Sequence, residues 1–491
     1  MSKDTIVRNT KASILIEVWN YEKDKLSHIQ EAISHLKIAL KQNTDYEEST
    51  ILMNLGNAYH KLANYEIQNN SRNLNPIAIG YLQNTIYYFR ESLKQDYRAD
   101  TLINLGNALD YLGRHIEAIE YYDKAINLNN RHYNAWVNRG ISCWNLSKKA
   151  DNQEDSKKLL SEAMMYIAIE LELYPDCPID DETKTIVRNF LNNNKITIDI
   201  DKTIKKHLPK KKGLLYESFN LYKNIEENFD EFYNTFCEKY ALFLNLHFDC
   251  EKCDLKFNDL IQFGIITDIN DFKKPYEVIT KWHELIDNYK TARLLLVLSQ
   301  YRHQDFLFLN KQRYDPDYSL NYIVNVELLK NCFTFTMNIF DKIAFFLNDY
   351  EELGLPDNQV TFYGSKSIFY RTEILKRNNW QKDLVAIDSI RYDLEKSEYK
   401  KLVDIRNYIV HRYFMLHDII KVKNLTYPYD SKGTPIEKKE YHMDIQEFFK
   451  MTILLLQYAR NTIFSLGFFV SQKENEKARI VKGIIPTIKL Y

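Results

Sequence analysis

Residues 102–128 read LINLGNALDYLGRHIEAIEYYDKAINL, and the spacing within this stretch decides the fold of the first third of the chain. Its NLGNA segment, at 104–108, occurs earlier at 54–58 and returns loosely as NRG at 138–140. The glycines at 106 and 140 are 34 residues apart. Because a fixed period of roughly 20–50 residues is typical of stacked repeats, we expect an array of helix pairs.

The second helix of each pair repeats as well. EAI at 117–119 matches EAI at 31–33, and EAM at 162–164 opens a further copy. Two spacings are longer than 34 residues: Gly56 to Gly106 is 50, and Ala118 to Ala163 is 45. We interpret the extra residues, which are polar, as longer helices or loops inside the repeats.

These repeats resemble the tetratricopeptide (TPR) family. In the repeat that contains Gly106, the family's pattern falls on Leu102, Leu105, Gly106, Leu109, Gly113, Ala118, Tyr122, Ala125 and Leu128. The small residue at Gly106 lets the second helix approach closely near Ala118. The resemblance implies a concave surface for a protein or peptide partner, and the alternative is an arm that positions or dimerises the rest of the chain.

The composition of the 491 residues narrows the class of function. Lys and Arg number 66 and Asp and Glu 67, so no overall field attracts nucleic acid and any RNA contact needs a local patch. Only 12 Gly and 10 Pro are present, which favours long helices over many-stranded folds or glycine-rich phosphate loops. The first residues lack a secretory signal, and polar side chains interrupt the most apolar window, 451–471. We therefore expect a cytoplasmic chain without a membrane span.

Three parts are expected along the chain. They are TPR-like repeats at 1–178, a basic linker with a middle helical segment at 179–298, and a helical bundle at 299–491. The linker contains the densest basic run, in which Lys210, Lys211 and Lys212 could contact an RNA backbone. A solvated linker is the alternative, and it is the usual role of such charge runs.

The middle segment contains a cluster with the side chains of a metal site. His247, Cys250 and Cys253 could offer three zinc ligands, but no second pair follows at zinc-finger spacing. Thiols without a metal are the preferred interpretation. We expect no cofactor and no metal.

Three long apolar helices are predicted in the last third of the chain, at 324–350, 400–420 and 444–469. The second contains DIRNYIVHRYF at 404–414. Because a helix turns about 100° per residue, the arginine of this segment lies at the centre of the apolar arc, where a leucine would be expected.

Arg406 needs an anion at that position. Burying a guanidinium is costly unless it is paired, so it either pairs with an internal acid such as Asp341 or Asp404, or meets a phosphate. Asn407 and His411, about 100° and 140° further round the helix, edge the same face. A cation, an amide and a titratable imidazole together could serve phosphoryl transfer without a metal.

RNYIVH at 406–411 fits the R-x4-H motif, with a polar residue after the arginine, of the HEPN ribonuclease superfamily. That family is an all-α bundle with the motif on its third helix. Residues from about Ser299 to Asn475 resemble the branch found behind TPR arrays in bacteria. The expected fold class is all-α, a TPR-type helical solenoid followed by a HEPN helical bundle.

The resemblance implies metal-independent RNA cleavage. The substrate's own 2′-hydroxyl attacks the adjacent phosphorus and leaves a 2′,3′-cyclic phosphate and a 5′-hydroxyl. His411 would act as general acid or base, Arg406 would stabilise charge on the phosphorane oxygens, and Asn407 would orient His411 or the phosphate.

Three neighbouring charges, Asp341, Lys342 and Arg412, could contact RNA or support the motif, and otherwise they are ordinary surface charges. The family commonly builds its site from two protomers. A homodimer through the HEPN bundle would use the apolar face around Arg406 as its interface.

We therefore predict an endoribonuclease of the toxin or phage-defence type that cleaves tRNA or mRNA and is regulated through its TPR array. The alternative is a catalytically inactive HEPN–TPR scaffold for protein–protein interactions. In that case Arg406 is a paired core residue and His411 a satisfied interface histidine.

Overall fold

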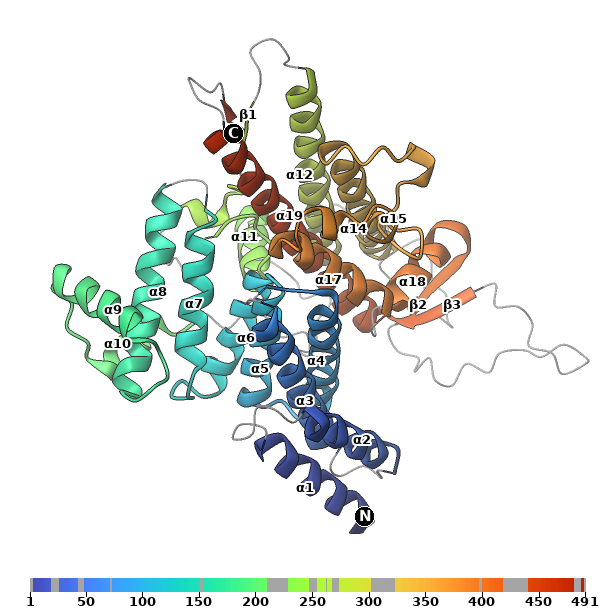
Figure 1. The fold of residues 1–491 in the computed structure, drawn as a ribbon. Coiled ribbons are helices and arrows are strands. Elements are labelled where there is room, and N and C mark those ends of the chain that lie inside the picture. The colour runs from blue at the N-terminus through green and yellow to red at the C-terminus, as the bar shows by residue number, and fades with distance from the viewer. Residues whose placement is uncertain are drawn as a thin grey trace, which may run out of the picture. The chain divides into compact units, whose positions relative to one another are not determined.

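The computed structural model describes residues 3–18, 26–42, 48–70, 73–150, 153–209, 228–246, 254–261, 263–266, 273–301, 323–396, 400–417, 440–480 and 487–489. These residues are largely helical, so the expected all-α class is confirmed (Figure 1). The chain divides into two compact units. The repeat unit comprises residues 1–211 and 375–389, and the bundle unit comprises residues 212–374 and 390–491.

The repeat unit is a stack of helix pairs. The pairs are α1 (Lys3–Val18) with α2 (Leu26–Gln42), α3 (Glu48–Asn69) with α4 (Pro76–Gln95), α5 (Ala99–Tyr111) with α6 (His115–Leu128), and α7 (Ala135–Ser147) with α8 (Gln153–Leu173). Each pair also packs on the next, which is the expected solenoid. Helices α3 and α4 have 22 and 20 residues, against 13 and 14 in α5 and α6, so longer helices account for the longer spacing.

Each repeat glycine leaves room for a large side chain of the paired helix. A Cβ atom at Gly106 would lie 2.5 Å from the ring of Tyr122. At Gly56 and Gly140 the nearest side-chain atom would lie 2.5 and 2.7 Å away. The side chain over Gly106 is thus Tyr122, one helical turn beyond Ala118, the residue named by the sequence pattern. Only glycine allows this approach between α5 and α6.

The repeat unit continues past residue 178. Helices α9 (Asp181–Asn193) and α10 (Ile200–His207) both pack on α8. Val187 of α9 is fully buried in a cluster with residues of α7 and α8. Part of the expected linker therefore consists of helices of the repeat unit, because α9 has an apolar face that α8 covers.

A segment distant in sequence also belongs to the repeat unit. Residues 375–389 were expected in the bundle, but they cluster with residues 1–211. They include most of α16 (Ile374–Arg377) and the first residues of α17 (Lys382–Lys396). Asp383 of α17 is buried and forms an ion pair with Lys149.

The bundle unit is built around long helices. They are α12 (Lys273–Gln300), α14 (Ile323–Tyr350), α18 (Lys400–His411) and α19 (Ile445–Ile480). Helix α14 packs against the other three, as expected for an early core helix. The shorter elements are α11 (Phe229–Lys239), α15 (Ile368–Arg371), and the 3-10 turns η1 (Asp254–Phe257) and η3 (Asp357–Gln359).

Helix α12 starts well before residue 299, the expected beginning of the bundle. Trp282, Leu285 and Tyr289 are buried along it, and α12 packs against α14 along much of its length. The bundle core therefore needs α12, because the apolar face of α14 would otherwise be exposed.

Two pairs of short strands accompany these helices. β1 (Gly264–Ile266) pairs antiparallel with β4 (Thr487–Lys489), and β2 (Tyr413–His417) pairs parallel with β3 (Glu440–Asp444). The helix expected at 400–420 is therefore wrong in its second part, since α18 ends at His411. Aromatic residues favour strands, and Phe414 stacks on Tyr441 of the neighbouring strand at 5.9 Å.

One helix among the described residues, over Ile445–Arg479, is long and apolar enough to cross a membrane. Its mean hydropathy is 1.3, and 89% of the apolar window is buried inside the protein. A core helix passes the same test, and Arg460 within it donates from Nε to the carbonyl of Phe243 at 3.0 Å. These contacts favour the core helix expected at 451–471.

Candidate active site

The described residues cover helix α18 on one side. Leu402 and Ile405 are fully buried, whereas Val410 is 50% exposed and Asn407 and His411 are exposed. The apolar arc of the helix is therefore packed on the Ile405 side and open on the Val410 side. Arg406 lies at the border between the two, and Asn407 and His411 lie beyond the open side.

The guanidinium of Arg406 lies at this border. Its side chain is 30% exposed, less buried than the helical pattern predicts, because nothing in the described chain covers Val410. Nη2 donates to Oδ1 of Asn338 at 3.2 Å and lies 3.4 Å from Oδ2 of Asp341. Both contacts use the same nitrogen. Within the described residues Nη1 and Nε therefore make no hydrogen bond, and their N–H groups can donate to a ligand.

Asp341 is a weak counter-ion for Arg406. Burial raises the pKa of its carboxyl group, and this exceeds the opposing effect of the Arg406 charge and of a hydrogen bond from the backbone of Phe362. The half-buried Tyr363 is close to both charges: burial and the Asp341 charge raise the pKa of its hydroxyl well above the ordinary value, and the Arg406 charge opposes them. Arg406 and Asp341 therefore form one long contact and no two-point ion pair.

The sequence reasoning found Asp341 and missed Asn338. The two residues are three positions apart on α14, a spacing that puts side chains on one helix face. This spacing from Asp341 is the sequence feature that could have placed Asn338 near Arg406. Tyr363 lies outside the helices, where no periodicity indicates which side chains point inward.

The remaining motif residues follow α18. His411 is its last residue, about 7.5 Å along the axis from Arg406, and Asn407 lies between them on the exposed side. Arg412 follows directly, with its guanidinium 5.4 Å from the ring centroid of Tyr408. The structure therefore keeps Asn407 and His411 accessible near Arg406.

Other sequence candidates lie elsewhere. Lys342 forms an ion pair with Glu284 of α12, so its charge is engaged away from the motif. Lys210, Lys211 and Lys212 lie outside the described residues, as do His247, Cys250 and Cys253. Within the described part of the chain, no three His, Cys, Asp or Glu side chains gather to hold a metal ion.

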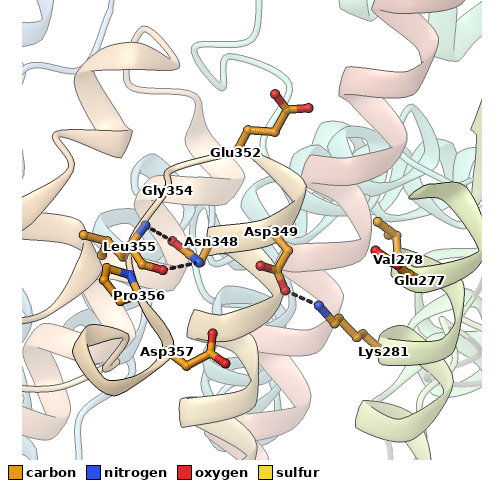
Figure 2. Close-up of a pocket in the computed structure, with 10 residues that line it drawn as sticks. All are labelled: Glu277, Val278, Lys281, Asn348, Asp349, Glu352, Gly354, Leu355, Pro356 and Asp357. Atoms are coloured by element: carbon orange, nitrogen blue, oxygen red, sulfur yellow. Dashed lines mark hydrogen bonds and ion pairs between the residues drawn. The ribbon is translucent and has the colours of Figure 1, made fainter. Parts of the chain in front are cut away.

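A separate pocket lies between α12 and α14. Figure 2 shows this pocket, of about 680 Å³, with Lys281 pointing at Asp349. Asn348 accepts from the N–H of Leu355 and donates to its carbonyl, both at 3.1 Å. The amide thus holds the turn after α14. No motif residue of α18 lines the pocket.

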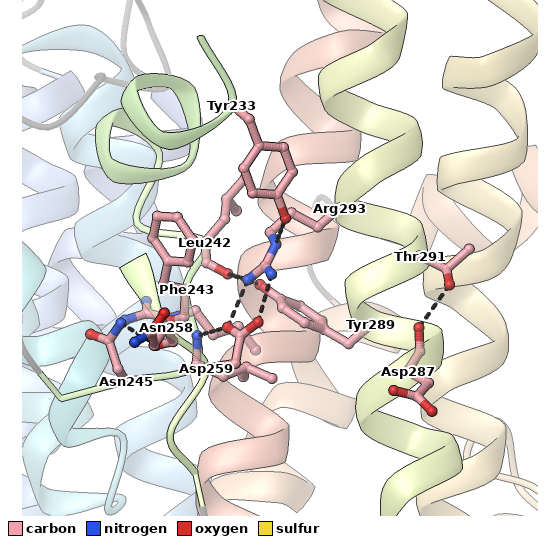
Figure 3. Close-up of polar contacts among 12 residues, drawn as sticks. Tyr233, Leu242, Phe243, Asn245, Asn258, Asp259, Asp287, Tyr289, Thr291 and Arg293 are labelled. Carbon is pink, nitrogen blue, oxygen red and sulfur yellow. Dashed lines mark hydrogen bonds and ion pairs between the residues drawn. The ribbon is translucent and has the colours of Figure 1, made fainter. Parts of the chain in front are cut away.

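A second arginine of the bundle unit shows what full pairing looks like. Arg293 donates from Nη1 and Nη2 to the two oxygens of Asp259 at 2.8 and 2.6 Å, and from Nε to the hydroxyl of Tyr233 at 2.7 Å (Figure 3). Its side chain is only 4% exposed. This is the geometry of a structural buried arginine, and Arg406 does not share it.

The fold and site define a helical-repeat protein joined to a helical bundle, with arginine, amide and imidazole side chains along one partly uncovered helix. Residues 269–473 match the family model of the LA2681-like HEPN domain, and residues 99–132 match the tetratricopeptide repeat. The chain therefore combines a TPR repeat with a LA2681-like HEPN domain, as the sequence predicts. No curated protein matches the chain.

Proposed function

We propose that this protein is a cytoplasmic, metal-independent endoribonuclease of the toxin or phage-defence type. It cleaves tRNA or mRNA by attack of the 2′-hydroxyl and leaves 2′,3′-cyclic phosphate and 5′-hydroxyl ends. The HEPN match supports a nuclease or defence role in general. The observation that carries the specific proposal is the partly exposed guanidinium of Arg406, which has two nitrogens without a partner in the described chain.

The chemistry needs two proton transfers and stabilisation of charge at phosphorus; residues of α18 supply one of the transfers and the stabilisation, and water or the second protomer supplies the other transfer. A base removes the proton of the 2′-hydroxyl as the oxygen–phosphorus bond forms, and an acid protonates the 5′-oxygen as its bond to phosphorus breaks. His411 supplies one of these proton transfers, because imidazole titrates near neutral pH. Arg406 stabilises the charge on the phosphorane oxygens, and Asn407 orients the phosphate or the imidazole.

The exposed side of α18 supports a homodimer. Val410 and Tyr413 are 50% and 67% exposed, and Phe335 of the neighbouring α14 is 38% exposed. A second copy packed on this side would bury these side chains and place two motifs together. It would also exclude water from Arg406, which strengthens its attraction for phosphate.

We expect light scattering to give about twice the chain mass of 58.6 kDa. Val410→Asp should shift the protein toward the monomer, because a carboxylate at the interface would be desolvated without a partner. Val7→Asp is the matched control, since Val7 is 62% exposed in the repeat unit. A mass of one chain at every concentration would contradict the dimer.

The TPR array supports a regulatory role. Such repeats bind proteins or peptides, and the stacked pairs of the repeat unit supply the surface for a partner. In this proposal the partner is an activator or inhibitor that controls cleavage by the bundle.

The central experiment incubates the purified protein with total RNA in the presence of EDTA. We expect cleavage that persists in the chelator and falls by about 10²–10⁴-fold in His411→Ala and in Arg406→Ala. Arg371→Ala, at an exposed arginine of α15, should cleave as the wild type does. Detection of 2′,3′-cyclic phosphate ends identifies the reaction.

The contact between Arg406 and Asp341 favours the second candidate, an inactive scaffold, because a paired arginine can be structural. In that case the wild type leaves RNA intact at high concentration, and Asp341→Ala destabilises the bundle as much as Arg406→Ala does. Cleavage that EDTA abolishes would contradict both candidates.

A further inference from the structure

We propose that Asn338 is a positioning residue for Arg406: its amide oxygen holds Nη2 and keeps the guanidinium from closing onto Asp341, so that its other nitrogens face an RNA phosphate. This inference rests on the proposed nuclease function, and nothing in the motif itself points to α14 position 338.

The geometry is a competition between two acceptors for one nitrogen. Asn338 and Asp341 lie on one face of α14, and both reach Nη2, at 3.2 and 3.4 Å. The amide contact is a hydrogen bond, while the carboxylate contact is longer and uses one oxygen. The neutral acceptor is therefore at least as close to the guanidinium as the charged one.

Arg293 shows the outcome that Asn338 prevents. In the same unit Arg293 and Asp259 form a two-point ion pair at 2.6 and 2.8 Å, and Nε and Nη1 also donate to the Tyr233 hydroxyl and the Leu242 carbonyl. In that state all three guanidinium nitrogens are engaged, and a carboxylate already neutralises the charge that a phosphate would need. Within the described residues Arg406 instead has one nitrogen held and the other two open, which is the state that phosphate binding requires.

The charge of the acceptor explains why an amide is needed. An amide oxygen orients the guanidinium without neutralising it, so Arg406 keeps its attraction for a phosphate. A second carboxylate at position 338 would add a negative charge at the same place. It would compete directly with the phosphate for the guanidinium.

The test replaces the amide by its isosteric acid and then exchanges the two acceptors. Asn338→Asp should weaken binding of a 2′-O-methyl RNA oligonucleotide, which cannot be cleaved, by about tenfold or more in fluorescence anisotropy at pH 8. The exchange variant, Asn338→Asp with Asp341→Asn, again has one amide and one carboxylate. It should bind within about threefold of the wild type. A loss of binding that the exchange does not restore overturns the proposal.

A second measurement is independent of RNA. Phenylglyoxal labels accessible guanidinium groups, and mass spectrometry reports the labelling rate of Arg406 against that of the exposed Arg371. We expect slower labelling of Arg406 in Asn338→Asp and recovery in the exchange variant. Equal rates in all three proteins overturn the proposal.

The two measurements also separate the two proposals. If the wild type binds and cleaves no RNA while the labelling rates change as expected, the positioning role stands and the nuclease function fails. If thermal denaturation shows that Asn338→Asp is not folded, Asn338→Ser replaces it. Without the amide, the guanidinium should pair with Asp341, and phenylglyoxal should label Arg406 more slowly. Unchanged labelling in Asn338→Ser overturns the positioning role.

Discussion

Two buried arginines of the described residues form close ion pairs with buried aspartates, and Arg406 differs from both at the residue scale. Arg139 of α7 is 1% exposed, pairs with Asp123 at 2.5 Å and lies 4.0 Å over the ring of Tyr166. Arg293 is satisfied in the same way by Asp259. Arg406 differs because the described part of the chain leaves one side of its helix open. Tertiary packing thus decides whether an arginine at an apolar helix position is fully paired inside the protein or can bind a ligand.

Glu170 of α8 offers a test at the same scale. Its side chain is fully buried, and Oε1 accepts the N–H of Asn134 at 2.6 Å at the start of α7. Burial raises the pKa of the carboxyl group from 4.5 to about 7. Between these values the native state holds a proton that the unfolded state releases. The free energy of unfolding should therefore fall as pH rises through this window.

We expect Glu170→Gln to remove this fall. The stability difference between wild type and variant should change by roughly 3 kcal/mol from pH 4.5 to 7 and stay constant above it. Urea denaturation at several pH values measures it. Glu172→Gln, at an exposed acid of the same helix, should follow the wild-type curve. A difference that does not vary with pH would contradict the expectation.

At the scale of the element, the close packing of α5 on α6 depends on Gly106. A methyl group there would meet the ring of Tyr122 at 2.5 Å. Gly106→Ala should therefore cost about 1–3 kcal/mol of stability, the usual cost of overpacking. Thermal or urea denaturation of the full chain measures this loss.

Gly80 in α4 is the matched control. A Cβ atom at Gly80 would have nothing within 4 Å. Gly80→Ala should then raise stability by about 0.5–1 kcal/mol, because alanine favours the helix interior over glycine. If both substitutions destabilise the protein, or neither does, the contact with Tyr122 does not determine the stability of the α5–α6 packing.

At the scale of the whole molecule, the chain returns to its repeat unit after residue 374. The loop between α5 and α6 receives this segment: Gly113, at a φ of 82°, would place a Cβ atom 2.6 Å from the carbonyl oxygen of Lys382. Arg114 donates to Ser389 at 3.1 Å. The repeat unit is therefore complete only when residues 375–389 are present.

The ion pair of Lys149 with Asp383 tests this dependence. Asp383 is buried, so removing Lys149 leaves a carboxylate with weaker partners. A double-mutant cycle with Lys149→Ala and Asp383→Ala should give a coupling energy of about 1–3 kcal/mol in urea denaturation. Hydrogen exchange at amides 384–389 should rise in each single variant.

The exposed pair of Lys202 with Asp199 is the control cycle. Its side chains are 87% and 55% exposed, so the coupling should stay below about 0.5 kcal/mol. Equal coupling in the two cycles would mean that residues 375–389 are not held by Lys149.

The sequence by itself determined the elements whose signals are local. The recurring glycines and alanines set the helix pairs of the repeat array, the apolar periodicity set α14 and α19, and the R-x4-H spacing singled out Arg406 and His411. Each signal lies within about 50 residues, because helix faces and repeat contacts are formed by near neighbours in the chain.

Only the tertiary structure decided what these elements meet. It ended α18 at His411, because β2 pairs with a strand beyond residue 439. It also joined residues 375–389 to the repeat unit and brought Asn338 to Arg406, 68 positions away. The physical reason is the same in each case: which face of a helix is covered, and which polar group reaches a charge, depends on segments that no local pattern relates.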